Sequence, residues 1–138
     1  MTDTPRTAGA RRRDRALAVA GAVAAAVVVW AVGDPLLGND LIVEQPGQEA
    51  MKLEIGAFAV FSLASSLLGW ALLAVLEKTT SRAALIWTVV ALIVLVLSFL
   101  PLTGVEATGE TKAVLALAHL AVGGVLIPGF WRTRKENP

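Results

Sequence analysis

The side chain with the clearest capacity for chemistry is His119, the only histidine in a chain of 138 residues. It lies within a long run of apolar residues, and it is the only titratable side chain inside any such run. Ser62 and Ser98 lie inside two other runs, and each of the three is seven or eight residues from the nearest charged residue. At the rise of an α-helix this is a depth of about 10–12 Å. The pattern predicts a polar cluster of His119, Ser62 and Ser98 at one level of a membrane.

The chemistry that such a cluster can support is limited. A serine nucleophile needs a base oriented by a third group and an oxyanion hole, but no acidic residue lies in the apolar runs. The favoured interpretation is a neutral imidazole that hydrogen-bonds a hydroxyl or carbonyl group of a neighbouring helix. The alternatives are contact with a ligand or lipid headgroup, and proton transfer or catalysis. We expect no catalytic residues.

Residue types that are missing exclude further classes of site. The chain has no cysteine and one histidine, which excludes thiol–disulfide exchange, iron–sulfur clusters and bis-histidine haem sites. The sequence has no glycine-rich phosphate loop and no nucleic-acid-binding pattern. We therefore expect no metal site, no cofactor and no nucleic-acid partner.

The elements that must position these residues are membrane-spanning helices. Hydrophobic residues make up 56% of the chain and charged residues 17%, against about 25% charged residues in soluble domains. Four segments, 16–33, 55–76, 83–105 and 113–131, contain no Asp, Glu, Lys or Arg. About 20 apolar residues cross a hydrocarbon core of about 30 Å, and a helix satisfies its own backbone there. The sequence predicts an all-α membrane protein. We expect an antiparallel bundle of four transmembrane helices in a domain 16–130, with spans at about 16–32, 55–76, 83–102 and 113–130.

The distribution of charge predicts how the bundle is oriented. Ten of the twelve Lys and Arg residues lie in the segments 1–15, 77–82 and 131–138, whereas seven of the eleven acidic residues lie in 34–54 and 106–112. Short loops rich in Lys and Arg stay in the cytoplasm. We expect a multi-pass protein of the cell membrane with basic cytoplasmic tails at 1–15 and 131–138. A cleaved signal peptide is the alternative for the first segment, but its apolar run exceeds the usual 7–15 residues.

The outer loop between the first two spans, 33–54, carries a turn signal. Pro46 and Gly47 fit the two central positions of a type II turn, because proline presets φ and glycine accepts a positive φ. Extended apolar segments flank the turn on both sides. We expect a short β-hairpin or paired extended segments over the outer mouth of the bundle.

Small and aromatic residues indicate how the spans pack. Small residues at helical spacing let two helices approach closely, and amphipathic Trp rings are typical of the membrane–water interfaces. The small residues expected at helix contacts are Gly21, Ala25, Ser66, Gly69 and Gly123. The expected interface anchors are Trp30, Trp70, Trp87 and Trp131. The third span is bulky and branched on every face, so we expect it to be the most lipid-exposed helix.

The segment 69–101, GWALLAVLEKTTSRAALIWTVVALIVLVLSFLP, is followed by TKAVLALAHLAVGGVLIPGF. Together they resemble a family of small uncharacterised membrane proteins of high-GC bacteria, classed as a domain of unknown function. The similarity covers about residues 16–130, and it implies a four-span fold with an unassigned role and no site residues.

The function expected from these observations is that of a non-enzymatic accessory or interaction protein of the bacterial plasma membrane. It would contact lipid, and it would bind a protein partner or a second copy through its helix faces or outer loop. The alternative is a small-molecule or lipid-binding protein or transporter with a pocket near His119, Ser62 and Ser98.

Overall fold

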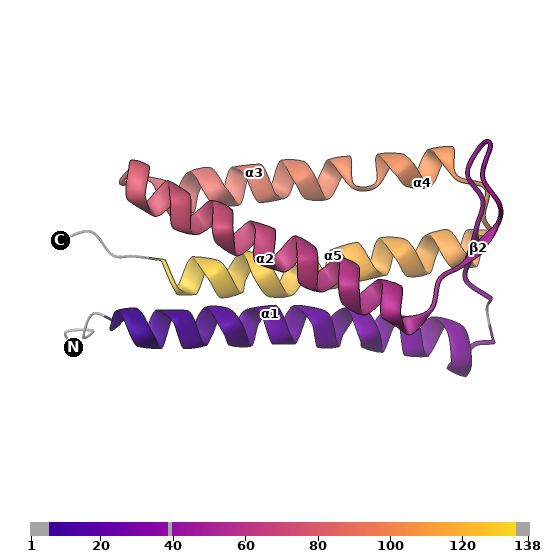
Figure 1. Cartoon of the computed structure of the whole chain (residues 1–138), viewed down its shortest axis with the longest axis horizontal. Helices are drawn as coiled ribbons and strands as arrows, with labels where there is room; N and C mark the ends of the chain where they lie inside the picture. Colours follow the sequence, from indigo (N-terminus) through magenta and orange to yellow (C-terminus); the bar gives the residue numbers. More distant parts are fainter. Residues whose placement is uncertain (1–5, 39, 135–138) are drawn as a thin grey trace.

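Four long helical segments form the protein in the computed structural model, which describes residues 6–38 and 40–134. Each is long and apolar enough to cross a membrane: Ala8–Asp34, Ile55–Thr79, Ala83–Gly104 and Gly109–Arg132. They run antiparallel, so that the first helix begins and the last helix ends at the same end of the bundle (Figure 1). The predicted bundle of four transmembrane helices is therefore confirmed.

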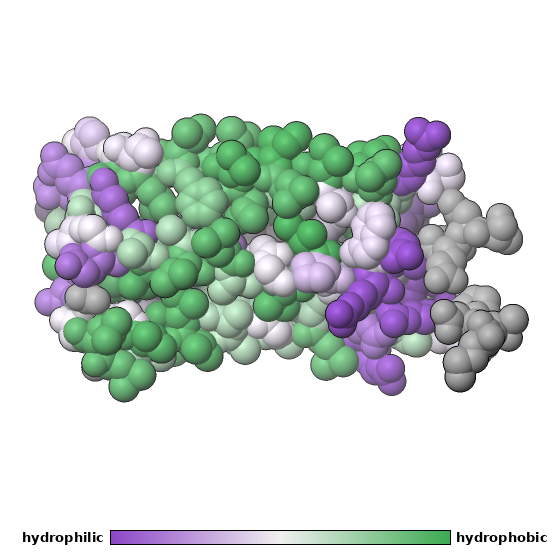
Figure 2. Space-filling model, turned by 180° about the vertical axis from the view of Figure 1, so that it is seen from behind, coloured by the Kyte–Doolittle hydropathy of each residue, from purple (hydrophilic) through white to green (hydrophobic). Residues whose placement is uncertain are grey.

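The apolar surface forms a belt between two polar ends. Figure 2 shows hydrophobic residues over the middle of the molecule and hydrophilic residues at both ends. Between 11% and 22% of the residues in the apolar windows of the four segments are buried inside the protein. Side chains that would be buried in the core of a soluble protein are thus turned outward, as expected where the surrounding solvent is lipid.

The first helix, α1 (Ala8–Ala31), begins eight residues before the expected span. Thr7 caps it, because its hydroxyl oxygen accepts a hydrogen bond from the backbone N–H of Ala10 at 3.1 Å. The helix thus includes most of the segment expected as a basic tail, while residues 1–5 and 135–138 lie outside the described residues. A short π-helical segment, η1 (Val32–Leu36), continues α1 directly after Ala31.

The other helices are α2 (Ile55–Thr79), α3 (Ala83–Leu97), α4 (Leu100–Gly104) and α5 (Gly109–Arg132). The main contacts close a ring in which α1 and α3 each pack against both α2 and α5. Helix α2 crosses the bundle obliquely, close to α3 at the inner end and close to α1 at the outer end (Figure 1). We call the end with the α2–α3 connection the inner end, and the opposite end, which carries the hairpin, the outer end.

The third segment is broken where a single span was expected. Helix α3 ends at Leu97, and α4 begins at Leu100 with Pro101 in its first turn. Proline has no backbone N–H and its ring collides with the preceding turn, which ends the helix that comes before it. The whole segment is the least buried of the four, at 11% against 17–22%. This supports the expectation that the third span faces lipid most.

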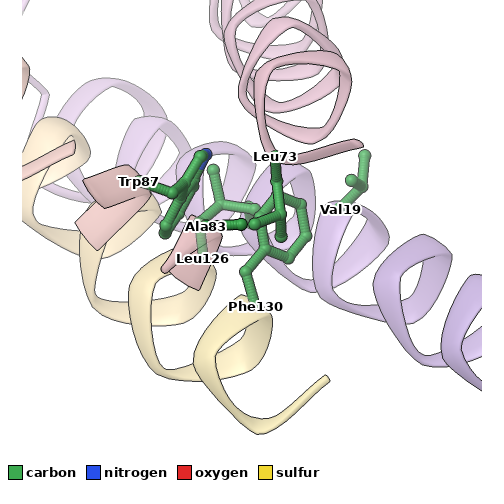
Figure 3. Packing of buried hydrophobic residues seen from close by; sticks show 7 residues of the cluster. Val19, Leu73, Ala83, Trp87, Leu126 and Phe130 are labelled. Carbon is green, nitrogen blue, oxygen red and sulfur yellow. The ribbon is translucent and has the colours of Figure 1, made fainter. Parts of the chain in front are cut away.

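One hydrophobic cluster holds the inner half of the bundle together (Figure 3). The rings of Trp87 on α3 and Phe130 on α5 lie 5.2 Å apart and tilted by 50°, a favourable arrangement for aromatic pairs. The other buried members come from all four helices: Val19, Ala22, Leu73, Ala83 and Leu126.

The predicted hairpin is confirmed in the first outer loop. Strands β1 (Ile42–Val43) and β2 (Met51–Lys52) pair antiparallel, with Ile42 opposite Lys52. The turn has the expected type II features, because the Gln48 N–H donates to the Gln45 carbonyl at 3.0 Å and Gly47 has a φ of 78°. The second outer loop joins the sheet through Glu106, which exchanges two backbone hydrogen bonds of 2.9 Å with Glu44.

Candidate functional site

His119 lies on α5 beside the break between α3 and α4. Its Nδ1 is 2.6 Å from the carbonyl oxygen of Leu115, one turn earlier in the same helix. Because a carbonyl oxygen only accepts, Nδ1 carries the proton in this bond, and the lone pair of the neutral ring is on Nε2. The ring packs against Phe99, with the two ring centroids 5.9 Å apart.

The two predicted serine partners of His119 also bond within their own helices. Ser62 is buried and donates to the carbonyl of Phe58 at 2.6 Å. Ser98 donates to the carbonyl of Leu95 at 2.5 Å, at the point where α3 ends. Among the described residues, no hydrogen bond links His119 to either serine. Each side chain is satisfied locally, so the structure does not assemble the three into one hydrogen-bonded cluster.

A shallow apolar hollow of about 270 Å³ lies on the outside of α3. It is lined by Leu92, Ile93, Val96 and Leu97, and it has no polar side chain among its lining residues. In a membrane this surface contacts lipid chains. Such a hollow supplies no group that could bind a polar substrate or carry out chemistry.

Of the small residues predicted for helix contacts, Gly21 and Gly123 lie at close approaches and Gly69 lies at ordinary contact distance from a neighbouring helix. A Cβ added at Gly21 would lie 3.3 Å from Val125, one at Gly69 would lie 3.6 Å from the ring of Trp87, and one at Gly123 would lie 3.1 Å from Leu95. Ser66 is fully buried and donates to the carbonyl of Ser62 at 2.6 Å. Ala25 is partly exposed on α1.

The four tryptophans differ from one another in role. Trp30 donates to the carbonyl of Leu53 at 3.3 Å and joins α1 to the outer loop, and Trp131 is 39% exposed near the inner end of α5. Trp87 differs from the expected interface anchor, because it is buried and donates to the carbonyl of Gly69 at 2.8 Å. Trp70 is half-buried against the same core. The ring of Trp87 therefore packs α3 onto α2.

A buried ion pair at the inner end was not anticipated from the sequence. Arg15 on α1 is 5% exposed, and its guanidinium group donates two hydrogen bonds to the carboxylate of Glu77 on α2, one of them 3.1 Å long. It also donates at 3.0 Å to both the hydroxyl and the carbonyl oxygen of Thr133, just after α5. We call Arg15, Glu77 and Thr133 the inner clamp. It joins three of the four helices.

A helical pattern in the sequence could have indicated the inner clamp. Arg15 stands one turn before Val19 in a stripe of buried residues that continues through Ala22 and Ala26. Glu77 stands one turn after Leu73, in line with the buried residues of α2. Both charged residues therefore continue core-facing stripes, although they also mark the ends of the apolar runs.

The outer loops form a folded surface that we call the outer cap, residues 40–54 and 105–108. Leu41 anchors it, because this side chain is fully buried among Phe58, Val114 and Ala118 of α2 and α5. The hydroxyl of Thr111 at the start of α5 donates to the carbonyl of Asp40 at 3.5 Å. The hairpin is thereby fixed to α2 and α5.

One ion pair lies on the outer cap. The Nζ of Lys52 is 3.2 Å from a carboxylate oxygen of Asp40. This hydrogen bond, helped by the charge of nearby Asp34, raises the pKa of Lys52 above its ordinary value of 10.5. One carboxylate oxygen of Asp34 is buried without a hydrogen-bond partner among the described residues. No group of three or more His, Cys, Asp or Glu residues in the described chain could hold a metal ion.

Comparison with known proteins identifies a family and no activity. A family model described as a family of unknown function (DUF6069) matches residues 6–136. No curated protein and no solved structure matches the chain.

Proposed function

The chain belongs to this family of unknown function, and from that premise we propose that it is a non-enzymatic accessory or interaction protein of the bacterial plasma membrane. Both termini lie in the cytoplasm, and the outer cap is the surface that meets a protein partner outside. The fold and the family together indicate a membrane protein of unassigned function with four apolar helices.

The observation that carries the proposal is that the outer cap is a fixed surface. Leu41 is buried in the bundle, Trp30 bonds the end of the hairpin, and Glu44 pairs with Glu106 of the other outer loop. A loop that only connected two spans would not need these three attachments. By contrast, His119 and Ser62 are hydrogen-bonded to their own helices, which supports a structural role for the polar groups inside the bundle.

The chemistry of the outer cap indicates what kind of partner it suits. Its exposed acids are Asp40, Glu44, Glu49, Glu54 and Glu106, and the ion pair with Asp40 uses Lys52, the one basic residue of the cap. The apolar side chains of Ile42 and Met51 are also exposed, on opposite faces of the hairpin. A surface with several exposed acids and exposed apolar side chains is complementary to a partner that presents basic residues beside apolar ones.

Site-specific crosslinking tests this proposal. A photo-reactive amino acid at Met51, which is 55% exposed, should capture one defined protein in native membranes. The same group at Val96, 67% exposed on the lipid-facing α3, is the matched control and should capture lipid. Glu49→Gln with Glu54→Gln should reduce the Met51 product several-fold. If Met51 and Val96 captured the same protein equally, the cap would not be the binding surface. The same would follow if the double Gln substitution left the amount of Met51 product unchanged.

A second function, binding of a small molecule or lipid near His119, is favoured by one observation. The break between α3 and α4 places Phe99 beside a histidine whose Nε2 accepts no hydrogen bond from the described residues. Irregular backbone within a membrane is tolerated mainly where it is buried or lines a cavity. His119→Leu separates the two functions, because a structural histidine predicts a measurable loss of stability when its bond to Leu115 and its contact with Phe99 are removed. An unchanged stability together with a lost cellular phenotype would favour the binding function.

A further inference from the structure

The inner end of the protein carries cations that no carboxylate of residues 6–38 or 40–134 neutralises. Two acids are described there: Asp14 pairs with Arg6 and Arg13, and Glu77 pairs with Arg15. The remaining basic side chains have no carboxylate within 4.0 Å among the described residues: Arg11, Arg12, Lys78, Arg82, Arg132 and Arg134. A bundle whose apolar belt ends in unpaired cations attracts anionic headgroups from the adjoining leaflet.

One of these cations is held against an exposed aromatic ring. The guanidinium carbon of Arg134 lies 4.8 Å from the ring centroid of Trp131, and one of its nitrogens donates to the Trp131 carbonyl oxygen at 3.0 Å. The ring orients the guanidinium group by a cation–π contact, and the donors not used in this bond remain available. A tryptophan that is 39% exposed at the end of the apolar belt lies at headgroup depth.

An apolar track leads from this pair along the outward face of α5. Its residues recur at spacings of three and four: Leu117, Leu120, Gly124, Pro128 and Trp131. All five are exposed, and a Cβ placed on Gly124 would meet no atom within 4 Å. The missing side chain leaves a notch between Leu120 and Pro128. From Trp131 to Leu120 the helix rises about 16 Å, which is close to half of a hydrocarbon core of about 30 Å.

From the cation, the ring and the track together, we propose that α5 binds an anionic phospholipid of the leaflet at the inner end. Arg134 and Arg132 bind its phosphate, Trp131 lies beside the glycerol region, and one acyl chain lies along Leu120 and the Gly124 notch. Charge complementarity selects an anionic headgroup, and the length of the track fits one leaflet. Figure 2 shows the junction on which this depends, where the hydrophobic belt meets the hydrophilic inner end.

Native mass spectrometry of the purified full-length protein tests the site, with phosphatidylglycerol and phosphatidylcholine as probes of equal chain length. We expect phosphatidylglycerol to be retained several-fold more than phosphatidylcholine. Arg132→Gln with Arg134→Gln should abolish that preference. The matched control, Arg12→Gln with Lys78→Gln, removes the same charge from α1 and α2 and should leave the preference within twofold. Both pairs leave the inner clamp unchanged, so the thermal midpoint serves as a check on folding.

Gly124→Leu tests the acyl track separately. Filling the notch should lower the retention of both lipids several-fold while the preference for phosphatidylglycerol is kept. Equal loss of preference in the Arg132/Arg134 pair and the Arg12/Lys78 pair would overturn the proposal in favour of a diffuse field. A dimer in the native protein that Gly124→Leu dissociates, with lipid retention unchanged, would overturn it in favour of a second copy of the chain on this face.

Discussion

At the scale of single residues, charge and small size determine how closely the helices approach. Arg15 is buried, and removing an ion from water is costly unless it is paired and hydrogen-bonded. Its guanidinium group satisfies this condition through Glu77 and Thr133. Gly33 acts through its small size, because the absence of a side chain leaves room for Val114 of α5 beside the end of α1.

Glu77→Ala should destabilise the protein by about 3 kcal/mol, because it leaves the Arg15 charge buried without a partner. The free energy of unfolding, measured by SDS titration in mixed micelles, checks this value. Asp14→Ala is the control, since it removes pairs with two exposed arginines, Arg6 and Arg13, and should cost less than about 1 kcal/mol. Arg15→Met with Glu77→Leu should recover most of the stability. Equal effects of Glu77→Ala and Asp14→Ala would contradict the buried pair.

Gly33→Ala should destabilise the bundle by about 1–3 kcal/mol, the usual cost of overpacking. The added Cβ would lie 2.7 Å from a methyl carbon of Val114, so either the Val114 side chain or the backbone beside it must shift. Gly56→Ala in α2, where nothing lies within 4 Å, should be neutral or stabilising by up to about 1 kcal/mol. Val114→Ala in the Gly33→Ala background should restore part of the loss. If Gly33→Ala and Gly56→Ala gave the same unfolding curve, the close contact would be refuted.

At the scale of elements, the hairpin turn was predictable and the break in the third span was missed. Proline and glycine at the centre of a turn act through local backbone geometry, which sequence alone specifies. Pro101 also acts locally, but it lies inside an apolar run whose length is suited to a span. Because hydropathy takes no account of the missing N–H of proline, it could not show that α3 ends at Leu97 and α4 begins at Leu100.

Gly47→Val should loosen the outer cap without unfolding the bundle. The backbone φ of 78° at this residue is disfavoured for a β-branched side chain by about 1–3 kcal/mol. Hydrogen exchange should accelerate by one to two orders of magnitude at the Gln48 and Leu53 amides, while the amides of α1 and α5 keep their protection. Gly109→Val, at the start of α5 with no positive φ, is the matched control. A uniform change over the whole chain would mean that the hairpin is not a separate unit.

At the scale of the whole molecule, composition and charge determined the architecture but not the internal contacts. Four apolar runs were sufficient to predict four spans, because a bilayer requires a fixed length of apolar helix. Charged residues mark the boundaries of such runs, so the length of a run does not predict the inner clamp, in which Arg15 and Glu77 pack inside the bundle. Similar depth in three helices also does not determine which way each side chain turns: His119, Ser62 and Ser98 each bond a carbonyl of their own helix.

The orientation of the bundle can be measured with single cysteines, because the natural chain contains none. A membrane-impermeant maleimide should label Gln48→Cys on the outer cap in intact cells. Thr79→Cys, exposed at the end of α2, should react only after the cells are permeabilised. The expected difference follows from the excess of Lys and Arg at the inner end. Labelling of Thr79→Cys in intact cells would reverse the orientation.

The contact between α1 and α5 also has a consequence for biogenesis. These helices are the first and the last of the four spans, and they meet closely, since a Cβ on Gly129 would lie 3.0 Å from that of Ala18. Spans insert individually before they associate. The nascent chain therefore holds α1 in the bilayer without its principal neighbour until the final span leaves the translocon. During that interval Arg15 lacks its hydrogen bonds to Thr133. We therefore expect membrane proteases to degrade a chain that stalls before α5 is inserted.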